Sequence, residues 1–225
     1  MDELALDTIR KNVTGILQNL PPEVLLVAAA KTRLPEEVKA AIKAGIQIVG
    51  YNYVQEAEFL RQTIDEPVKW HMIGHLQRNK VKKAVQLFDV IETIDSVRLA
   101  REVNKECAKL KKVMPVLIEI NSGKESNKTG VLPEDAIALI QQIKDLSNLE
   151  ILGLMTIGPR FGNPEDARPY FKITKTLFEQ IKKLKIPHVK MRYLSMGMSN
   201  SYQIALNEGA NIVRIGTRLF GSRNA

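Results

Sequence analysis

The chain has 225 residues, of which 44% are apolar and 26% are charged, as is ordinary for a globular protein with one good core. Its formal net charge of +8 raises the possibility of a nucleic-acid-binding protein. The lysines, however, are spread over the polar faces of amphipathic runs, and the sequence contains no recognisable nucleic-acid-binding motif. Solvated helix faces therefore explain most of the positive charge, and we expect no nucleic-acid partner.

The cysteine content and the N-terminus favour a cytoplasmic protein. The single cysteine, Cys107, excludes an internal disulfide and suits a reducing compartment. The acidic start Met1-Asp2-Glu3 is unlike a secretory signal peptide, and no apolar run is long enough to span a bilayer. We therefore expect a cytoplasmic protein that does not enter membranes. Separately, we expect a monomer.

The predicted elements alternate between strand and helix after an N-terminal helix at about 2–20, which the prolines Pro21 and Pro22 end. Eight continuous apolar runs predict strands at 25–31, 46–52, 70–74, 90–94, 114–121, 149–157, 191–195 and 212–215. Amphipathic runs between them predict helices at 35–44, 54–63, 79–87, 96–112, 133–146, 164–184 and 199–208. The polar insert 158–169 is interpreted as a surface loop, with a mobile flap as the alternative.

This alternation predicts the fold class. Strand-then-helix units are typical of a parallel sheet, and continuous apolar strands are expected where both sheet faces are covered. About eight such units in some 200 residues fit a closed (β/α)₈ TIM barrel. A doubly wound open sheet is the alternative, but no Gly-x-Gly-x-x-Gly turn follows the first strand. We predict one α/β domain over 1–225.

The first predicted strand ends in a lysine. In 25–32, apolar or small residues lead to Lys31 just before a turn, and Val27 and Ala29 would desolvate its amine and favour the neutral, nucleophilic form. Such an amine can form a Schiff base with a carbonyl compound or with pyridoxal phosphate. The alternative is that Lys31 only marks where the strand reaches water.

Small and polar residues also follow other predicted strands, at the barrel rim where active sites of this fold lie. Ser195-Met196-Gly197-Met198-Ser199 is predicted to open a helix whose backbone N–H groups, with the Ser199 hydroxyl, can bind phosphate oxygens. Gly216 and Thr217 offer a second small turn after the last strand. Serine at a helix start is also an ordinary N-cap, but TIM barrels commonly bind phosphate between these two loops.

Two further features admit more than one interpretation. Arg214, within the last apolar strand, can point into the barrel and face a ring nitrogen of a cofactor, or it can form a buried ion pair, for which Glu119 is the candidate partner. His71 and His75 are four residues apart, but they straddle a strand end and a turn and lack a third ligand, so we do not expect a zinc site.

These residues give the sequence a recognisable pattern: it resembles the pyridoxal phosphate homeostasis proteins, which are similar to the N-terminal barrel domain of alanine racemase. The matching segments span nearly the whole chain in the family's order. They are Ala30-Lys31-Thr32, Gly50-x-Asn52-Tyr53-Val54-Gln55-Glu56, Trp70-His71-x-Ile73-Gly74-x-Leu76-Gln77-x-Asn79-Lys80, Gly153-Leu154-Met155, Leu194-Ser195-Met196-Gly197-Met198-Ser199, and Val213-Arg214-Ile215-Gly216-Thr217 with Phe220-Gly221.

The resemblance implies a fold-type-III barrel that holds pyridoxal 5'-phosphate as an imine on Lys31. It implies that Asn52 lies near the imine and that Arg214 faces the pyridine nitrogen. It places the phosphate at four residues, namely Met198, Ser199, Gly216 and Thr217. The family usually has Glu where this chain has Tyr51, so any role of that carboxylate is in doubt here.

The resemblance also implies a protein that holds and supplies pyridoxal phosphate in vitamin B6 and amino-acid homeostasis, without efficient catalysis. Apo-enzymes that receive the cofactor, or a regulatory protein, are the partners it suggests. An amino-acid racemase or another pyridoxal phosphate enzyme is the alternative. Racemisation needs acid–base groups on both faces of the substrate carbanion, and this chain has no second domain to supply the opposing group.

Overall fold

The computed structural model describes residues 3–159 and 162–222, and its centre is a closed parallel barrel of eight strands in sequence order. Because β1 pairs in parallel with both β2 and β8, the sheet has no open edge. The strands are β1 (Leu25–Ala29), β2 (Ile48–Tyr51), β3 (Lys69–Met72), β4 (Val90–Ile94), β5 (Met114–Ile120), β6 (Leu149–Thr156), β7 (Val189–Ser195) and β8 (Ile212–Ile215). The (β/α)₈ prediction is confirmed.

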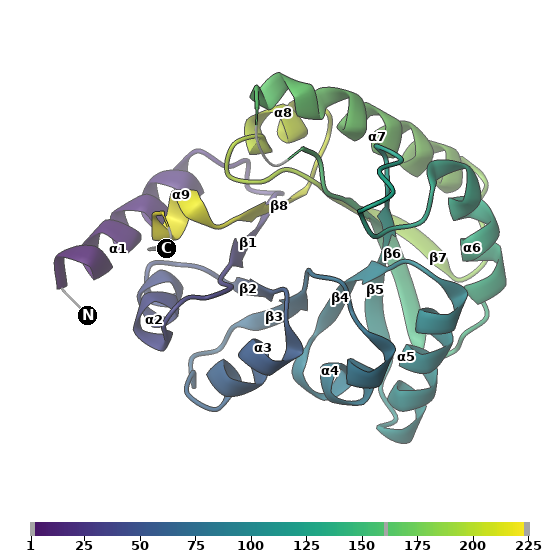
Figure 1. The fold of residues 1–225 in the computed structure, drawn as a ribbon, viewed down its shortest axis with the longest axis horizontal. Coiled ribbons are helices and arrows are strands. Elements are labelled where there is room, and N and C mark those ends of the chain that lie inside the picture. The colour runs from purple at the N-terminus through teal and green to yellow at the C-terminus, as the bar shows by residue number, and fades with distance from the viewer. Residues whose placement is uncertain (1–2, 160–161, 223–225) are drawn as a thin grey trace.

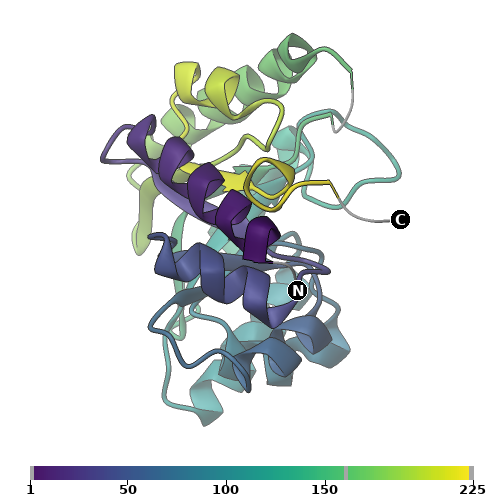
Figure 2. The ribbon, with the colours of Figure 1, turned by 90° about the vertical axis from the view of Figure 1, so that its left-hand side faces the viewer.

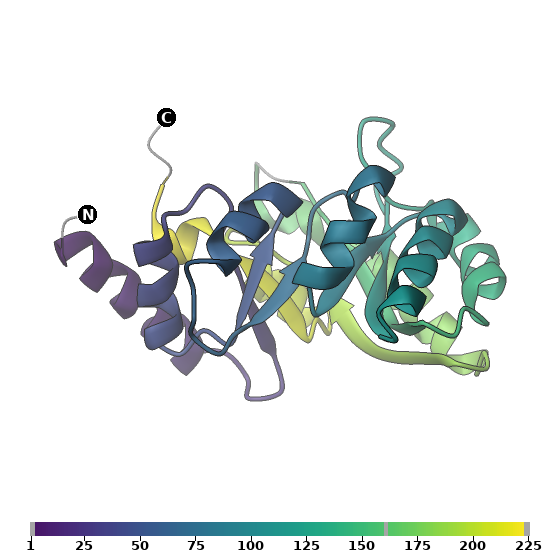
Figure 3. The same ribbon diagram turned by 90° about the horizontal axis from the view of Figure 1, so that it is seen from below.

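Helices surround the strands (Figure 1). They are α1 (Glu3–Gln18), α2 (Pro35–Lys43), α3 (Val54–Arg61), α4 (Val81–Leu87), α5 (Val97–Lys109), α6 (Ala136–Ile143), α7 (Arg168–Lys183), α8 (Tyr202–Asn207) and α9 (Thr217–Phe220), with 3₁₀ turns η1 (Arg78–Lys80), η2 (Pro133–Asp135) and η3 (Pro164–Ala167). Seen from below, α2 to α5 cover the near side of the strands (Figure 3). None of the helices in the described ranges combines the length and the apolar character needed to cross a bilayer.

The two ends of the described chain meet at one side of the barrel. The N-terminal α1 lies beside the C-terminal α9 in two perpendicular views (Figures 1 and 2). The Asn12 side-chain amide donates a 3.1 Å hydrogen bond to the Leu219 carbonyl oxygen. This contact fixes α9, and with it the turn that follows β8, against the first helix.

Alternate residues of β1 contribute to two separate apolar cores. Leu25, Val27 and Ala29 of β1 face the barrel interior, whereas Leu26 and Ala28 face the helices. The larger core lies between the strands and the helices, and the smaller one fills the lower barrel. This period of two continues beyond β1 and directs the next inward residue, Lys31, to the rim.

The structure differs from the sequence prediction at several element ends. The turn 195–199 was predicted to open a helix, but α8 begins only at Tyr202, because a loop stabilised by bonds from Ser201 and Tyr202 to the Met198 carbonyl comes first. The short α9 was not predicted. In the insert 158–169, Pro164–Ala167 forms η3 and Arg168 begins α7, so only part of the insert is loop; Arg160 and Phe161 lie outside the described residues.

Candidate functional site

A cavity of about 560 Å³ opens at the carboxyl ends of the strands. All seven residues that the sequence predicted for a cofactor site line it, namely Lys31, Asn52, Met198, Ser199, Arg214, Gly216 and Thr217. They come from four segments of the chain: the turns after β1 and β2, the loop after β7, and the stretch from β8 into α9. The structure therefore brings the predicted set together in one place, with room for a small cofactor.

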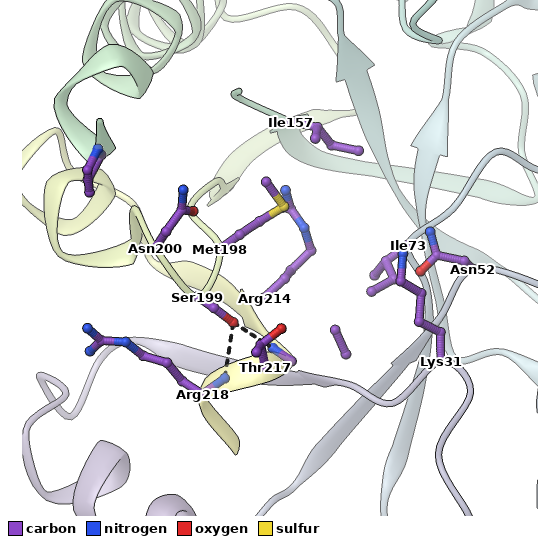
Figure 4. A pocket seen from close by; sticks show the side chains of 13 residues that line it. Lys31, Asn52, Ile73, Ile157, Met198, Ser199, Asn200, Arg214, Thr217 and Arg218 are labelled. Atoms are coloured by element: carbon purple, nitrogen blue, oxygen red, sulfur yellow. Dashed lines mark hydrogen bonds between the residues drawn. The ribbon is translucent and has the colours of Figure 1, made fainter. Parts of the chain in front are cut away.

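Lys31 and Asn52 form one side of the cavity, where their side chains point toward one another (Figure 4). Ala29 and Ile73 provide apolar surface beside them, whereas Val27 is fully buried one layer deeper in the barrel interior. The expected apolar surroundings of Lys31 are therefore supplied by Ala29 and Ile73 at the rim rather than by Val27.

The turn after Lys31 is held in an unusual conformation. Thr32 has a φ of 62°, in the left-handed region that β-branched residues rarely adopt. A Glu56 carboxylate oxygen, Oε1, accepts a 3.1 Å hydrogen bond from the Thr32 backbone N–H. Glu56 lies on α3, so this bond ties the lysine-bearing turn to the segment that carries Asn52. Glu56 belongs to the motif at 50–56, but the sequence analysis assigned it no role.

Ser199 lies on the opposite side of the cavity, next to the start of α9 (Figure 4). Its hydroxyl oxygen accepts hydrogen bonds from the backbone N–H groups of Gly216, at 3.2 Å, and Arg218, at 3.4 Å. These contacts join the loop after β7 to the turn after β8. Backbone N–H groups and two hydroxyls, those of Ser199 and Thr217, thus gather at one end of the cavity.

Gly197 allows the loop after β7 to take this path. Its φ of +96° is in the region that favours glycine. A Cβ at this position would lie 2.6 Å from the Ala205 Cβ and 2.9 Å from the Tyr202 Cα, so no larger residue fits without moving α8. Met198 and Ser199 follow directly and are placed at the cavity by this turn.

Arg214 points inward from β8 and is 4% exposed. Its Nη2 donates to the Thr156 carbonyl oxygen at 2.7 Å, and its Nη1 donates to the Ser195 hydroxyl oxygen. Ser195 in turn donates to Glu92 Oε2 at 2.6 Å, and the other oxygen of Glu92 lies 2.7 Å from His71 Nδ1. A buried polar chain therefore runs under the cavity from β3 to β8.

The carboxylate that balances Arg214 is Glu92, and the alternative of an ion pair with Glu119 is wrong. Glu92 Oε2 lies 3.9 Å from Arg214 Nη1, whereas Glu119 accepts a bond from the Thr129 hydroxyl and leaves its Oε2 without a partner among the described residues. The sequence did not single out Glu92. The only feature of the sequence that pointed to Glu92 was its position as a charged residue at the centre of an apolar strand.

Burial and local charge shift the ionisation of these groups in different directions. Burial opposes ionisation of Glu92, but the hydrogen bond from His71 and the charge of Arg214 outweigh it, and the pKa of Glu92 falls below its ordinary value. Burial lowers the pKa of Arg214, while Glu92 and Glu119 act against that shift. Burial raises the pKa of Glu119, and the nearby charge of Asp95 adds to the rise.

The two histidines considered for zinc have other contacts. His71 faces the barrel interior and contacts Glu92, whereas His75 lies at the rim with its Nδ1 3.4 Å from Asp95 Oδ2. Within the described ranges, no group of three or more histidine, cysteine or acidic residues is arranged to hold a metal ion.

Tyr51, the departure from the family pattern, lies outside the cavity. It is fully buried between the strands and the helices, and its ring stacks on Trp70 with centroids 5.3 Å apart. Burial, and secondarily the charge of Glu56, raises the pKa of its hydroxyl, which has no hydrogen-bond partner among the described residues. Tyr51 therefore does not line the cavity, and the nearby carboxylate of Glu56 bonds the turn that follows Lys31.

Comparison with known proteins identifies the family of this chain. The family described as alanine racemase, N-terminal domain, matches residues 4–224. A pyridoxal phosphate homeostasis protein of Aquifex aeolicus (strain VF5) is 42% identical over 88% of this chain and 86% of its own length. One of Mus musculus is 38% identical over 97% of this chain and 84% of its own length. The chain belongs to the pyridoxal phosphate homeostasis protein family.

Two kinds of solved structure share its fold. PipY of Synechococcus elongatus PCC7942, in a structure with pyridoxal phosphate bound, superposes with a TM-score of 0.87 at 32% identity, covering 95% of this chain and all of that chain. An alanine racemase of Clostridium difficile 630 gives a TM-score of 0.79 at 17% identity, covering 97% of this chain and 60% of that chain. This second likeness concerns the barrel alone.

Proposed function

We propose that this protein binds pyridoxal 5'-phosphate in the cavity at the barrel rim, covalently but reversibly at Lys31, and supplies it to other proteins in vitamin B6 and amino-acid homeostasis. One observation carries the proposal: a lysine amine, a buried guanidinium and a cluster of backbone N–H groups and hydroxyls line one cavity of about 560 Å³. The names of the family's members support it.

The residues fit the three chemically distinct parts of this cofactor. Ser199, Thr217 and the N–H of Gly216 offer donors for the phosphate at one end, beside Met198. Lys31 offers an amine at the other end, where Asn52 lies within reach of it. Arg214 lies between them and offers a donor to the pyridine nitrogen. When bound, the cofactor supplies an aldehyde that condenses with a primary amine and releases water.

Holding and release, rather than efficient catalysis, is the role that these side chains favour. The charged residues that line the cavity in the described part of the chain are Lys31, Arg214 and Arg218. Arg214 keeps its proton at neutral pH, so it leaves the ring nitrogen unprotonated and the ring a poor electron sink. No second acid–base group faces Lys31 from among these lining residues, and racemisation would need one.

Borohydride reduction tests the proposed linkage. The purified protein should be yellow, and reduction should fix the mass of pyridoxal phosphate on the peptide that contains Lys31. In Lys31→Ala both signals should be lost, because no other lysine lines the cavity in the described ranges. Lys69→Ala, an exposed lysine at the start of β3, is the matched control and should keep both. Labelling of Lys31→Ala with unchanged affinity would refute the assignment.

The racemase alternative makes a separate claim that chiral analysis decides. If the protein is a carrier, incubation of the loaded form with L-alanine should yield no D-alanine at enzymatic rates, while addition of an apo-enzyme that requires the cofactor should restore that enzyme's activity. Turnover of about 1 per second or faster would favour the alternative, since this is the lower range of ordinary enzymes.

Three further parts of the proposal stay predictions. The chain is proposed to act as one domain over 1–225, as a monomer and in the cytoplasm. Light scattering of the purified protein, with and without pyridoxal phosphate, would measure its mass in solution, and cell fractionation would locate it. Transfer assays, rather than the sequence, would identify the apo-enzymes or the regulatory protein that it contacts.

A further inference from the structure

A second, smaller pocket of about 280 Å³ lies beside the cofactor cavity, between the loops that follow β2 and β3. Asn52 lines both cavities, so the two are neighbours at the rim. The remaining lining comes from two motifs of the sequence, 52–56 and 70–80, that the proposed cofactor site leaves mostly unused. These motifs need another explanation.

The lining of the second pocket is suited to a small anion with an apolar part. Its apolar surface comes from the buried side chains of Val54, Met72 and Leu76. Its polar lining residues are Asn52, Tyr53, Gln55, His75, Gln77 and Lys80. No aspartate or glutamate lines it in the described ranges, so the lining carries a net positive charge.

Lys80 is the cation of this pocket. Helix η1 places it at the rim, half-buried, and no described carboxylate lies within ion-pair distance of its ammonium group. The neighbouring lysine Lys83, by contrast, pairs with Glu58. A half-buried ammonium beside two amide side chains can form charge-assisted hydrogen bonds with a carboxylate.

The size and position of the pocket select its ligand. Its volume is half that of the cofactor cavity, which suits a molecule of a few non-hydrogen atoms. Because Asn52 lies next to Lys31 in Figure 4, a molecule in the second pocket can direct one end toward Lys31. We propose that this pocket binds the carboxylate of a small amino acid and thereby positions its amine to displace Lys31 from the cofactor.

This exchange step rests on the proposed function, whereas carboxylate binding does not. In the exchange, the incoming neutral amine forms a C–N bond to the cofactor's aldehyde carbon while the C–N bond to Lys31 Nζ breaks. The incoming nitrogen loses two protons as it forms its double bond to carbon, and both pass to the Lys31 nitrogen, which leaves as a neutral amine; nothing is oxidised or reduced. Amines that carry a carboxylate should therefore exchange more readily than amines of similar size that lack one.

The binding step is tested on the protein without cofactor, by proton NMR of the His75 ring during titration with propionate. Replacement of His75 by Gln identifies its signal among the three histidines of the chain. We expect a saturable shift of the His75 signal with propionate and none with propanol. Lys80→Met should abolish the shift, while Lys82→Met, an exposed lysine of α4, should keep it. A shift that survives in Lys80→Met, or no shift at all, would overturn the proposed pocket.

The exchange step is tested on the loaded protein with glycine and methylamine. The loss of cofactor from Lys31 is followed by absorbance and by borohydride trapping on the Lys31 peptide. The ratio of the two exchange rates should fall roughly tenfold in Lys80→Met, as expected on losing one charge-assisted bond, and should hold in Lys82→Met. An unchanged ratio would refute the proposal that this pocket binds the amino acid, and it would leave the proposal of cofactor binding at Lys31 unaffected.

Discussion

At the residue scale, the balance of charge around Arg214 decides what the cavity offers to a ligand. A buried guanidinium costs much free energy unless a carboxylate compensates it. Glu92 supplies that compensation through Ser195, and its second oxygen is held by His71. Glu92 thus positions Arg214 without touching the cavity itself.

Glu92→Gln should weaken the binding of pyridoxal phosphate and change the spectrum of the Lys31 linkage. The amide keeps the volume but removes the negative charge, so the positive charge of Arg214 is less compensated. The positive charge of Arg214 disfavours protonation of the proposed imine nitrogen at Lys31. The midpoint of the spectral pH titration of that imine should therefore move to lower pH. The charge-assisted bond that Glu92 accepts from Ser195 lies within the protein, so its loss predicts a cost of up to about 1.5–3 kcal/mol in the free energy of unfolding.

Glu119→Gln is the matched control for that prediction. Glu119 also faces Arg214 from within the barrel, but no hydrogen bond joins the two among the described residues. Its replacement should move the titration midpoint much less than Glu92→Gln does. Equal shifts for the two variants would show that the hydrogen-bonded chain through Ser195 has no special part in positioning Arg214.

The sequence identified Arg214 but not its partner, for a physical reason. An arginine in an apolar strand signals burial, and burial requires a counter-charge, but which strand supplies it depends on the stagger of the barrel. Glu92 and Glu119 both lie in apolar strands, and only the closed register places Glu92 beneath Ser195. Lys31 was easier to identify, since the period of two along β1 alone directs it to the rim.

At the scale of elements, the loop after β7 and the start of α9 act as one unit. The Ser199 hydroxyl accepts bonds from Gly216 and Arg218, so it already occupies two N–H groups of the proposed phosphate site. A phosphate with its several acceptor oxygens can take over these donors and the hydroxyls as well.

Ser199→Ala and Thr217→Ala should each weaken the binding of pyridoxal phosphate far more than that of pyridoxal. Each variant removes one charge-assisted hydrogen bond to the phosphate, which predicts a cost of about 1.5–3 kcal/mol. Equilibrium titration of both ligands by absorbance measures the difference. Equal losses for the two ligands would place the phosphate elsewhere in the cavity.

Element boundaries here were harder to predict than element types. The turn after β7 has the serine and glycine content of a helix start, yet α8 begins three residues after Ser199, because Gly197 adopts a positive φ and the Met198 carbonyl accepts two loop N–H bonds. The four-residue α9 is too short to show a helical period. Both features depend on packing against α8 and α1 that no local pattern encodes.

At the scale of the whole molecule, the barrel interior contains two layers whose burial has opposite effects on stability. The lower interior is filled by apolar side chains such as Val27, Leu117 and Ile212, which contribute to stability by burial. The upper interior contains Glu92, Glu119 and Arg214, whose burial costs free energy. The continuous apolar runs of the sequence predicted strands covered on both faces, which agrees with the lower layer, whereas the upper layer reflects the use of the cavity.

Glu119 should make the stability of the whole barrel depend on pH in a specific direction. Burial raises its pKa in the folded protein above the ordinary value of 4.5, so the folded state binds this proton more tightly than the unfolded state does. The resulting stabilisation is complete below the ordinary pKa and is lost as the pH rises through the raised one. The loss amounts to about 1.4 kcal/mol for each unit of the shift.

Urea denaturation at a series of pH values from below 4.5 to neutral measures this effect. As the pH rises, the free energy of unfolding of the wild type should decrease relative to that of Glu119→Gln, and the difference should level off above the raised pKa. Relative to Glu92→Gln, the free energy of unfolding of the wild type should instead increase as the pH rises. The reason is that the pKa of Glu92 is lowered in the folded protein, so its stabilisation is lost as the pH falls. Parallel pH curves for wild type and Glu119→Gln would mean that solvent or a counter-charge compensates the buried carboxyl in solution.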